Sequence, residues 1–131
     1  MVCLDTTFVV DLIRGKDFVN SFIDKFEQDE EAIYIATPVI MELAKGAGLG
    51  VNKVEEKKKI KSFLSSFTIL DFDEESAFLA GEIDANLRSE GEIIQIEDIM
   101  IGSIALKNNE TLITRNKKHF EKIKGLKIES Y

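Results

Sequence analysis

The sequence has little of what builds disulfide frameworks or thiol-dependent active sites. Its 131 residues include one cysteine, one proline, one histidine and no tryptophan. A single cysteine excludes an intramolecular disulfide. The only histidine, His119, lies in a polar stretch far along the chain, which argues against a Cys–His catalytic pair. We therefore expect Cys3 to be a small buried residue of the first strand.

Long apolar runs are also missing. None approaches the roughly 18 residues that a membrane-spanning helix needs, and the N-terminus has neither a basic region nor the apolar core of a signal peptide. Hydrophobic residues make up 44% of the chain and charged residues 31%, as in ordinary globular proteins. We expect a single domain over residues 1–131, located in the cytoplasm and without membrane contact.

The net charge is −7, which argues against sequence-independent binding of nucleic acid through a broad basic surface. A nuclease remains compatible with this charge, because carboxylates that bind a metal ion are part of the negative total. Two stretches gather the basic residues. They are Lys53, Lys57, Lys58, Lys59 and Lys61, then Arg115, Lys117, Lys118, Lys122, Lys124 and Lys127. Solvated helix faces explain the first stretch better than ligand binding does.

Short apolar segments alternate with amphipathic ones, which predicts an α/β fold with a parallel sheet. The expected strands cover residues 2–5, 32–36, 68–72, 111–114 and 126–129. Helices are expected up to about residue 14, then around 18–26, from 38 to about 46, over 52–67, 74–87 and 99–106, and around 117–123. Thr37 is the expected N-cap of the third helix, with Pro38 in its first turn, and Asp73 is the expected N-cap of the fifth.

Three acids stand where such a fold places functional groups. Asp5 closes the first apolar strand, and ligands of open α/β sheets gather at the carboxyl ends of strands. Glu42 lies one turn into the third helix, and Asp98 lies at the start of a helix that is apolar on nearly all sides. A fourth polar residue, Asn116, follows the strand at 111–114. Converging carboxylates predict a site for Mg²⁺ or Mn²⁺, which prefer oxygen ligands.

Each of these residues also has a plain structural interpretation. Asp5, Asp98 and Asn116 are all suitable helix caps, and Glu42 is an ordinary residue for a helix surface. Glu97 adjoins Asp98 and competes with it for the role of ligand. The two side chains face about 100° apart on a helix, and we assign the role to Asp98.

Four segments together resemble the PIN-domain family, and within it the VapC-type toxin ribonucleases of toxin–antitoxin pairs. The segments are LDTTFVVDLI from position 4, MEL from position 41, EDIMIGSIA from position 97 and LITRNKKHF from position 112. The resemblance covers essentially the whole chain. It implies a three-layer α/β/α sandwich around a central parallel sheet.

The resemblance also implies a function and site residues. It matches Asp5, Glu42 and Asp98 to the family's regular acidic positions and Asn116 to a fourth position that is often aspartate. Thr6 and Thr114 match hydroxyl positions beside the first and fourth. The implied activity is Mg²⁺- or Mn²⁺-dependent endoribonuclease cleavage that leaves a 5′-phosphate and a 3′-hydroxyl. The implied partners are RNA, a small VapB-like antitoxin and a second copy of the chain.

Within that picture Asp5 and Asp98 hold the metal, and Glu42 contributes through a ligand water, a second metal or the attacking water. The residue types predict that Arg115 and Lys117 reach RNA phosphates, although ordinary surface charge explains them equally well. A single-stranded or looped RNA suits such a cleft best. Replacing the fourth acid by Asn116 removes one charge and so weakens the case for a second metal.

Other functions fit less well. A haloacid-dehalogenase-like phosphatase needs a second aspartate two residues after the first, where this chain has Thr7. A receiver domain needs an acidic pair near the first strand, and none adjoins Asp5, although Asp71 lies near the end of the third. Two alternatives stay within the family: an RNA-maturation or housekeeping ribonuclease, and an inert PIN-like module that only binds a partner.

Overall fold

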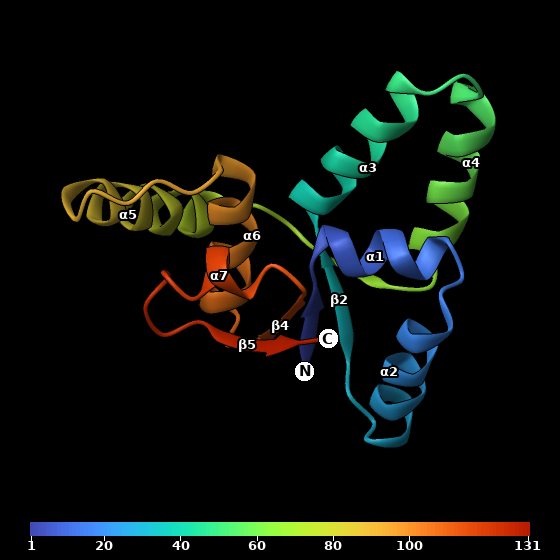
Figure 1. Cartoon of the computed structure of the whole chain (residues 1–131), viewed down its shortest axis with the longest axis horizontal. Coiled ribbons are helices and arrows are strands. Elements are labelled where there is room, and N and C mark those ends of the chain that lie inside the picture. The colour runs from blue at the N-terminus through green and yellow to red at the C-terminus, as the bar shows by residue number, and fades with distance from the viewer.

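Five short segments form one parallel sheet in the computed structural model, which describes all 131 residues (Figure 1). The sheet order is β3-β2-β1-β4-β5, and every neighbouring pair is parallel. The strands are β1 (Val2–Leu4), β2 (Ile33–Ala36), β3 (Thr68–Leu70), β4 (Thr111–Thr114) and β5 (Lys127–Ser130). The predicted parallel α/β fold is confirmed.

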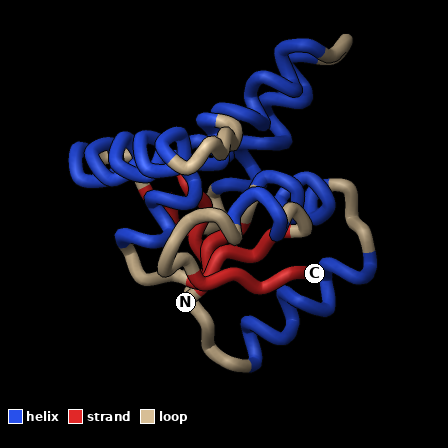
Figure 2. Tube along the Cα trace, turned by 60° about the vertical axis from the view of Figure 1, so that its left-hand side comes forward, coloured by secondary structure: helices blue, strands red, loops and turns tan.

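Helices lie on both sides of this sheet (Figures 1 and 2). They are α1 (Thr6–Ile13), α2 (Asp17–Gln28), α3 (Thr37–Leu49), α4 (Lys53–Leu64), α5 (Glu74–Ser89), α6 (Ile96–Lys107) and α7 (Lys117–Phe120). One side carries α1 and α2. The other carries α6, with α5 and α7 against it. The helices α3 and α4 form a hairpin that continues from the carboxyl end of β2. No helix is both long and apolar enough to cross a membrane.

Successive strands are added on one side of β1 first and on its other side afterwards. From β1 the connections lead through β2 to β3, and the α5–α6 connection then returns past β1 to β4. Right-handed crossovers place the helices of these two parts on opposite faces. The carboxyl ends of β1 and β4 therefore flank the topological switch point, where open α/β sheets bind ligands.

The core is centred on β1 and α6. All of β1 is buried, and Ile99, Ile101 and Ile104 of α6 are completely enclosed. A methyl group on Gly102 would lie 2.5 Å from Cδ1 of Ile123, so the absence of a side chain lets the segment after α7 approach α6 closely. The expectation that this helix is central is confirmed.

Several predicted boundaries hold, and others need correction. Asp73 caps α5 by accepting a hydrogen bond from the Ser76 backbone N–H at 2.9 Å, as predicted. Thr37 is not the N-cap of α3: Ala36 takes that position, and the Thr37 hydroxyl instead accepts from the backbone N–H of Phe72 at 3.0 Å. Its side chain therefore ties the start of α3 to the chain leaving β3.

Several helices differ in extent from the prediction, among them α7, which ends at Phe120 and not near residue 123. Because α6 begins at Ile96 with Gln95 as its N-cap, Asp98 lies inside the first turn and is not a cap. The third helix was expected to end at about residue 46, but α3 includes Gly48 and continues to Leu49. The apolar side of α4 is only partly buried, because that helix belongs to the projecting hairpin and contacts the core along one edge.

Candidate functional site

Asp5 lies at the centre of the carboxyl edge of the sheet. Its backbone N–H donates to the Ile113 carbonyl at 3.0 Å, which continues the pairing of β1 with β4 by one residue. Its buried carboxylate accepts two hydroxyl hydrogen bonds at Oδ2, from Thr114 at 2.7 Å and from Thr7 at 3.0 Å. Burial raises the pKa of Asp5, and these hydrogen bonds act against that rise.

Glu42 reaches the same region from the second turn of α3. Its Oε2 accepts a hydrogen bond from the hydroxyl of Thr6, the first residue of α1. Burial raises the pKa of Glu42, and the negative charges of Asp5, Asp98 and Glu97 raise it further. Glu42 thus shares an electrostatic environment with both of the other predicted acids.

Asp98 comes from the opposite side, on the first turn of α6. It is 8% exposed, and its Oδ2 lies 3.0 Å from Nδ1 of His119 on α7. Burial raises the pKa of Asp98, the hydrogen bond from His119 lowers it, and the charges of Asp5 and Glu97 add to the rise. The three predicted acids therefore lie in one electrostatic neighbourhood at the switch point, Asp5 directly after β1 and the other two on α3 and α6.

The donor set matches a hard divalent cation by chemistry, although the side chains are not gathered around one point. No group of three His, Cys, Asp or Glu side chains encloses a possible metal position; hydroxyl and imidazole donors engage the carboxylates instead. Neither Asp5 nor Glu42 forms an ion pair with a lysine or arginine, and each raised pKa reflects burial of uncompensated negative charge. Mg²⁺ and Mn²⁺ supply the missing positive charge and prefer these oxygens.

The remaining predicted residues divide between this cluster and its rim. The Thr114 hydroxyl contacts Asp5 and also accepts the backbone N–H of Asn116 at 2.9 Å. Asn116 stands at the N-cap position of α7, but its side chain makes no capping hydrogen bond. Lys117 is exposed beside it. Arg115 turns away from the acids, because its Nη1 pairs with Asp11 at 3.1 Å.

Asp11 is a buried acid beside this rim that the sequence pattern did not single out. Although it is completely buried on α1, it pairs with Lys16 at 2.9 Å and with Arg115, and it accepts a hydrogen bond from the Tyr131 hydroxyl at 3.1 Å. Lys16 first, then Tyr131 and Arg115, hold the pKa of Asp11 below its usual range. The one feature of the sequence that could have revealed its burial is an acid among the apolar residues of a short helix.

His119 and Thr7 were missed for a different reason. Their contacts with Asp98 and Asp5 depend on which side chains the fold brings together, and spacing in the sequence does not predict that. Cys3, by contrast, behaves as expected. It is buried and free, and burial raises the pKa of its thiol to about 12, which removes it from nucleophilic chemistry.

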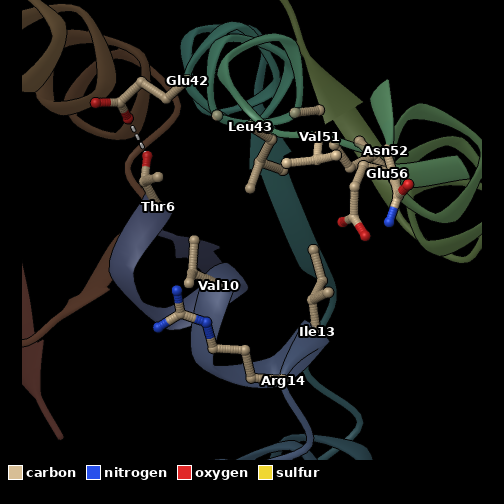
Figure 3. Close-up of a pocket in the computed structure, with 13 residues that line it drawn as sticks. Thr6, Val10, Ile13, Arg14, Glu42, Leu43, Val51, Asn52 and Glu56 are labelled. Atoms are coloured by element: carbon tan, nitrogen blue, oxygen red, sulfur yellow. Dashed lines mark hydrogen bonds between the residues drawn. The ribbon is translucent and has the colours of Figure 1, made fainter. Parts of the chain in front are cut away.

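A groove of about 490 Å³ leads away from Thr6 and Glu42 (Figure 3). One wall is α1, with Val10, Ile13 and the adjoining Arg14, and the other is the α3–α4 hairpin. Apolar side chains line its middle. A second groove on the other side of Glu42 is lined by Met41, Leu49, Ile96 and Glu97, among others.

Comparison with known proteins gives a consistent result. The PIN-domain family profile matches residues 2–126. The chain is 35% identical over 99 residues to ribonuclease VapC2 of Rickettsia felis, a match that covers 76% of this chain and 74% of that protein. It is 27% identical over 128 residues to the tRNA(fMet)-specific endonuclease VapC of Salmonella typhimurium, covering 98% and 96% of the two chains.

Solved structures agree over nearly the full length. The VapBC2 complex of Rickettsia felis, bound to a DNA fragment from its promoter, contains a chain that superposes with a TM-score of 0.91 at 31% identity, covering 100% of this chain and 99% of that one. A chain of DNA-bound VapBC from Salmonella typhimurium superposes with a TM-score of 0.88 at 27% identity, covering 99% and 98%.

Proposed function

The chain belongs to the PIN-domain family, and on this premise we propose that it is a divalent-metal-dependent endoribonuclease, the toxin of a toxin–antitoxin pair. The observation that carries the proposal is that Asp5, Glu42 and Asp98 share one electrostatic neighbourhood at the switch point of the sheet, with no basic side chain neutralising Asp5 or Glu42. The names of the two relatives, a ribonuclease and a tRNA-specific endonuclease, support RNA as the substrate.

In this mechanism Asp5 and Asp98 would hold the cation, and Glu42 would contribute through a ligand water, a second cation or the attacking water. When bound, a divalent cation stabilises charge on the scissile phosphate and lowers the pKa of a bound water. Thr7 and Thr114 fix Asp5 Oδ2, so the carboxylate is presented in one orientation. Glu42 orients the attacking water and accepts its proton. Attack on phosphorus would break the bond to the 3′-oxygen, which takes a proton from solvent, and would leave a 5′-phosphate and a 3′-hydroxyl.

The charges around the site bear on how RNA binds. The acids repel a phosphate chain until the cation is present. Lys117 is exposed at the start of α7 and makes no ion pair, so its charge is available to a backbone phosphate, with Asn116 as a hydrogen-bond donor beside it. The guanidinium of Arg115 already pairs with Asp11, so the main role of Arg115 is to stabilise the loop before α7. A flexible single-stranded or looped RNA fits this open edge best.

We propose a small VapB-like protein as the antitoxin, in line with the VapBC complexes that this chain resembles. The groove between α1 and the α3–α4 hairpin suits a protein segment better than RNA. Its middle is apolar, with Val10, Ile13 and Ile60, whereas its inner end opens at Glu42. Apolar side chains followed by a basic one would match both parts and would place a positive charge at the acids.

We propose that a second copy of the chain packs against the second groove, on the surface formed by Met41, Leu49 and Ile96. Met41, Leu49 and Ile96 are exposed there, Leu49 by 80%. Large apolar side chains grouped on one surface favour association. Leu49→Glu should then shift the protein from dimer to monomer in light scattering, whereas Val54→Glu, an equally apolar but separate position on α4, should not.

The direct test is cleavage of a pool of structured RNAs by the purified protein, with mapping of the new 5′ ends. We expect cleavage with Mg²⁺ or Mn²⁺, none in EDTA, and none with Asp5→Asn. Cleavage that survives metal removal would contradict the mechanism, and a protein that binds RNA but never cleaves it would be an inert binding module. Protection of the cell by an antitoxin encoded next to this gene would separate a toxin from a housekeeping nuclease.

A further inference from the structure

His119 makes the one contact that fixes the Asp98 carboxylate. Its Nδ1 lies 3.0 Å from Asp98 Oδ2, and this contact joins α7 to α6 across 21 positions of the chain. When Asp98 is ionised, its carboxylate can only accept hydrogen bonds, and Nδ1 is then the donor of this contact. No other side chain in the structure donates to Asp98, whereas Asp5 has two hydroxyl donors and Glu42 has one.

The backbone around His119 is fixed by a hydrogen bond and by a buried neighbour. The backbone N–H of His119 donates to the Asn116 carbonyl at 2.9 Å, and the next residue, Phe120, is completely buried. The position of the histidine is therefore set by a core residue, while its side chain remains 52% exposed. Exposure allows the side chain to be replaced without emptying the core.

We propose that His119 is a positioning residue for the metal site, acting by holding Oδ2 of Asp98 through Nδ1. This inference rests on the metal-dependent function proposed above. With Oδ2 engaged by the imidazole, Oδ1 is the oxygen of Asp98 that has no protein donor and is available to a cation. The sole histidine of the chain thus supports a carboxylate ligand, a common arrangement around protein-bound metals.

The two nitrogens of the ring can be separated by substitution. Asparagine places an N–H donor near the position of Nδ1, glutamine places one near Nε2, and alanine removes both. If Nδ1 is the working atom, His119→Asn should keep most of the function, whereas His119→Gln and His119→Ala should both lose it. If Nε2 contacts the metal or RNA directly, the order of the Asn and Gln variants reverses.

The test measures Mn²⁺ affinity by calorimetry, without RNA, for the wild type and the three variants. We expect His119→Ala and His119→Gln to weaken binding about tenfold, the size typical for a group that orients a metal ligand, and His119→Asn to stay within about threefold. RNA cleavage at saturating Mn²⁺ should follow the same order. Urea unfolding of all four proteins establishes that the variants are folded.

Each outcome decides the matter. Unchanged Mn²⁺ affinity in His119→Ala would overturn the positioning role while leaving the proposed nuclease intact. Rescue by glutamine instead of asparagine would overturn it in favour of direct contact by Nε2. A wild-type protein that binds no Mn²⁺ would contradict the proposed function itself and this inference with it.

Discussion

The hydroxyl of Thr114 donates to Oδ2 of Asp5 over 2.7 Å, so the last residue of β4 fixes the carboxylate that follows β1. Thr114→Val keeps the shape of this buried side chain and removes both the donor to Asp5 and the acceptor of the Asn116 backbone N–H. We expect a loss of about 2 kcal/mol in the free energy of unfolding, the usual size for a hydrogen bond to a charged group, and slower RNA cleavage. Urea unfolding and initial rates measure the two effects. Thr114→Ser, which keeps the hydroxyl, is the control, and a valine variant as active as wild type would remove this bond from the mechanism.

Neutralising an acid of the site should stabilise the metal-free protein. Burial and neighbouring negative charge raise the pKa of Asp98, which means that its ionised form costs folding free energy. In EDTA at neutral pH, Asp98→Asn should gain about 1 kcal/mol, as is common where activity and stability compete. Glu55→Gln, at an exposed position on α4, should change nothing comparable. A destabilised Asp98→Asn protein would show that the cluster is not electrostatically strained.

We predict that Asp11 stabilises the folded protein and that the size of this contribution depends on pH. Its ion pairs lower its pKa in the folded state, so its contribution is fully present above the unfolded pKa of about 3.9 and is lost as the pH falls through the lower folded value. Asp11→Asn should destabilise the protein at pH 7 by about 1 to 2 kcal/mol, because it weakens hydrogen bonds to a charged group, and the difference from wild type should shrink as the pH falls below about 4. Urea unfolding across this range tests it. A difference that is independent of pH would show that packing, not charge, explains the loss.

Asn116 predicts an effect on metal binding. Its side chain does not cap α7, which removes the simplest structural explanation for a polar residue there. If it occupies the fourth acidic position, Asn116→Asp should tighten Mn²⁺ binding in the absence of RNA, because one more carboxylate faces the cation. Turnover need not rise, since the added charge also repels phosphate. Equal dissociation constants for the two proteins would exclude Asn116 from the site.

Much of the fold was predictable from the sequence because its signals are local. Apolar runs mark the strands, and Asp73 and Gly102 act as their residue types suggest. Thr37 was assigned wrongly because a hydroxyl beside a proline resembles an N-cap, whereas a tertiary hydrogen bond to Phe72 occupies it. The start of α6 was misplaced because Ile96 and Glu97 carry no capping signal.

The positions of the acids were predictable, but their partners were not. Asp5 and Asp98 follow from strand ends and helix starts, which are regular features of such sheets. His119 and Asp98 lie 21 positions apart in the chain, and Asp11 and Tyr131 lie 120 positions apart. Side-chain packing decides these contacts, and no spacing rule in a single sequence encodes them.

Asp98 is the acid on which the proposed metal site most depends, and the adjacent Glu97 provides a matched control for it. The measurement is the Mg²⁺-dependent rate of RNA cleavage by wild type, Asp98→Asn and Glu97→Gln under identical conditions. We predict that Asp98→Asn loses about 100-fold or more, equivalent to about 3 kcal/mol of transition-state stabilisation, and that Glu97→Gln stays within about threefold of wild type. A large loss in Glu97→Gln with little change in Asp98→Asn would contradict the account.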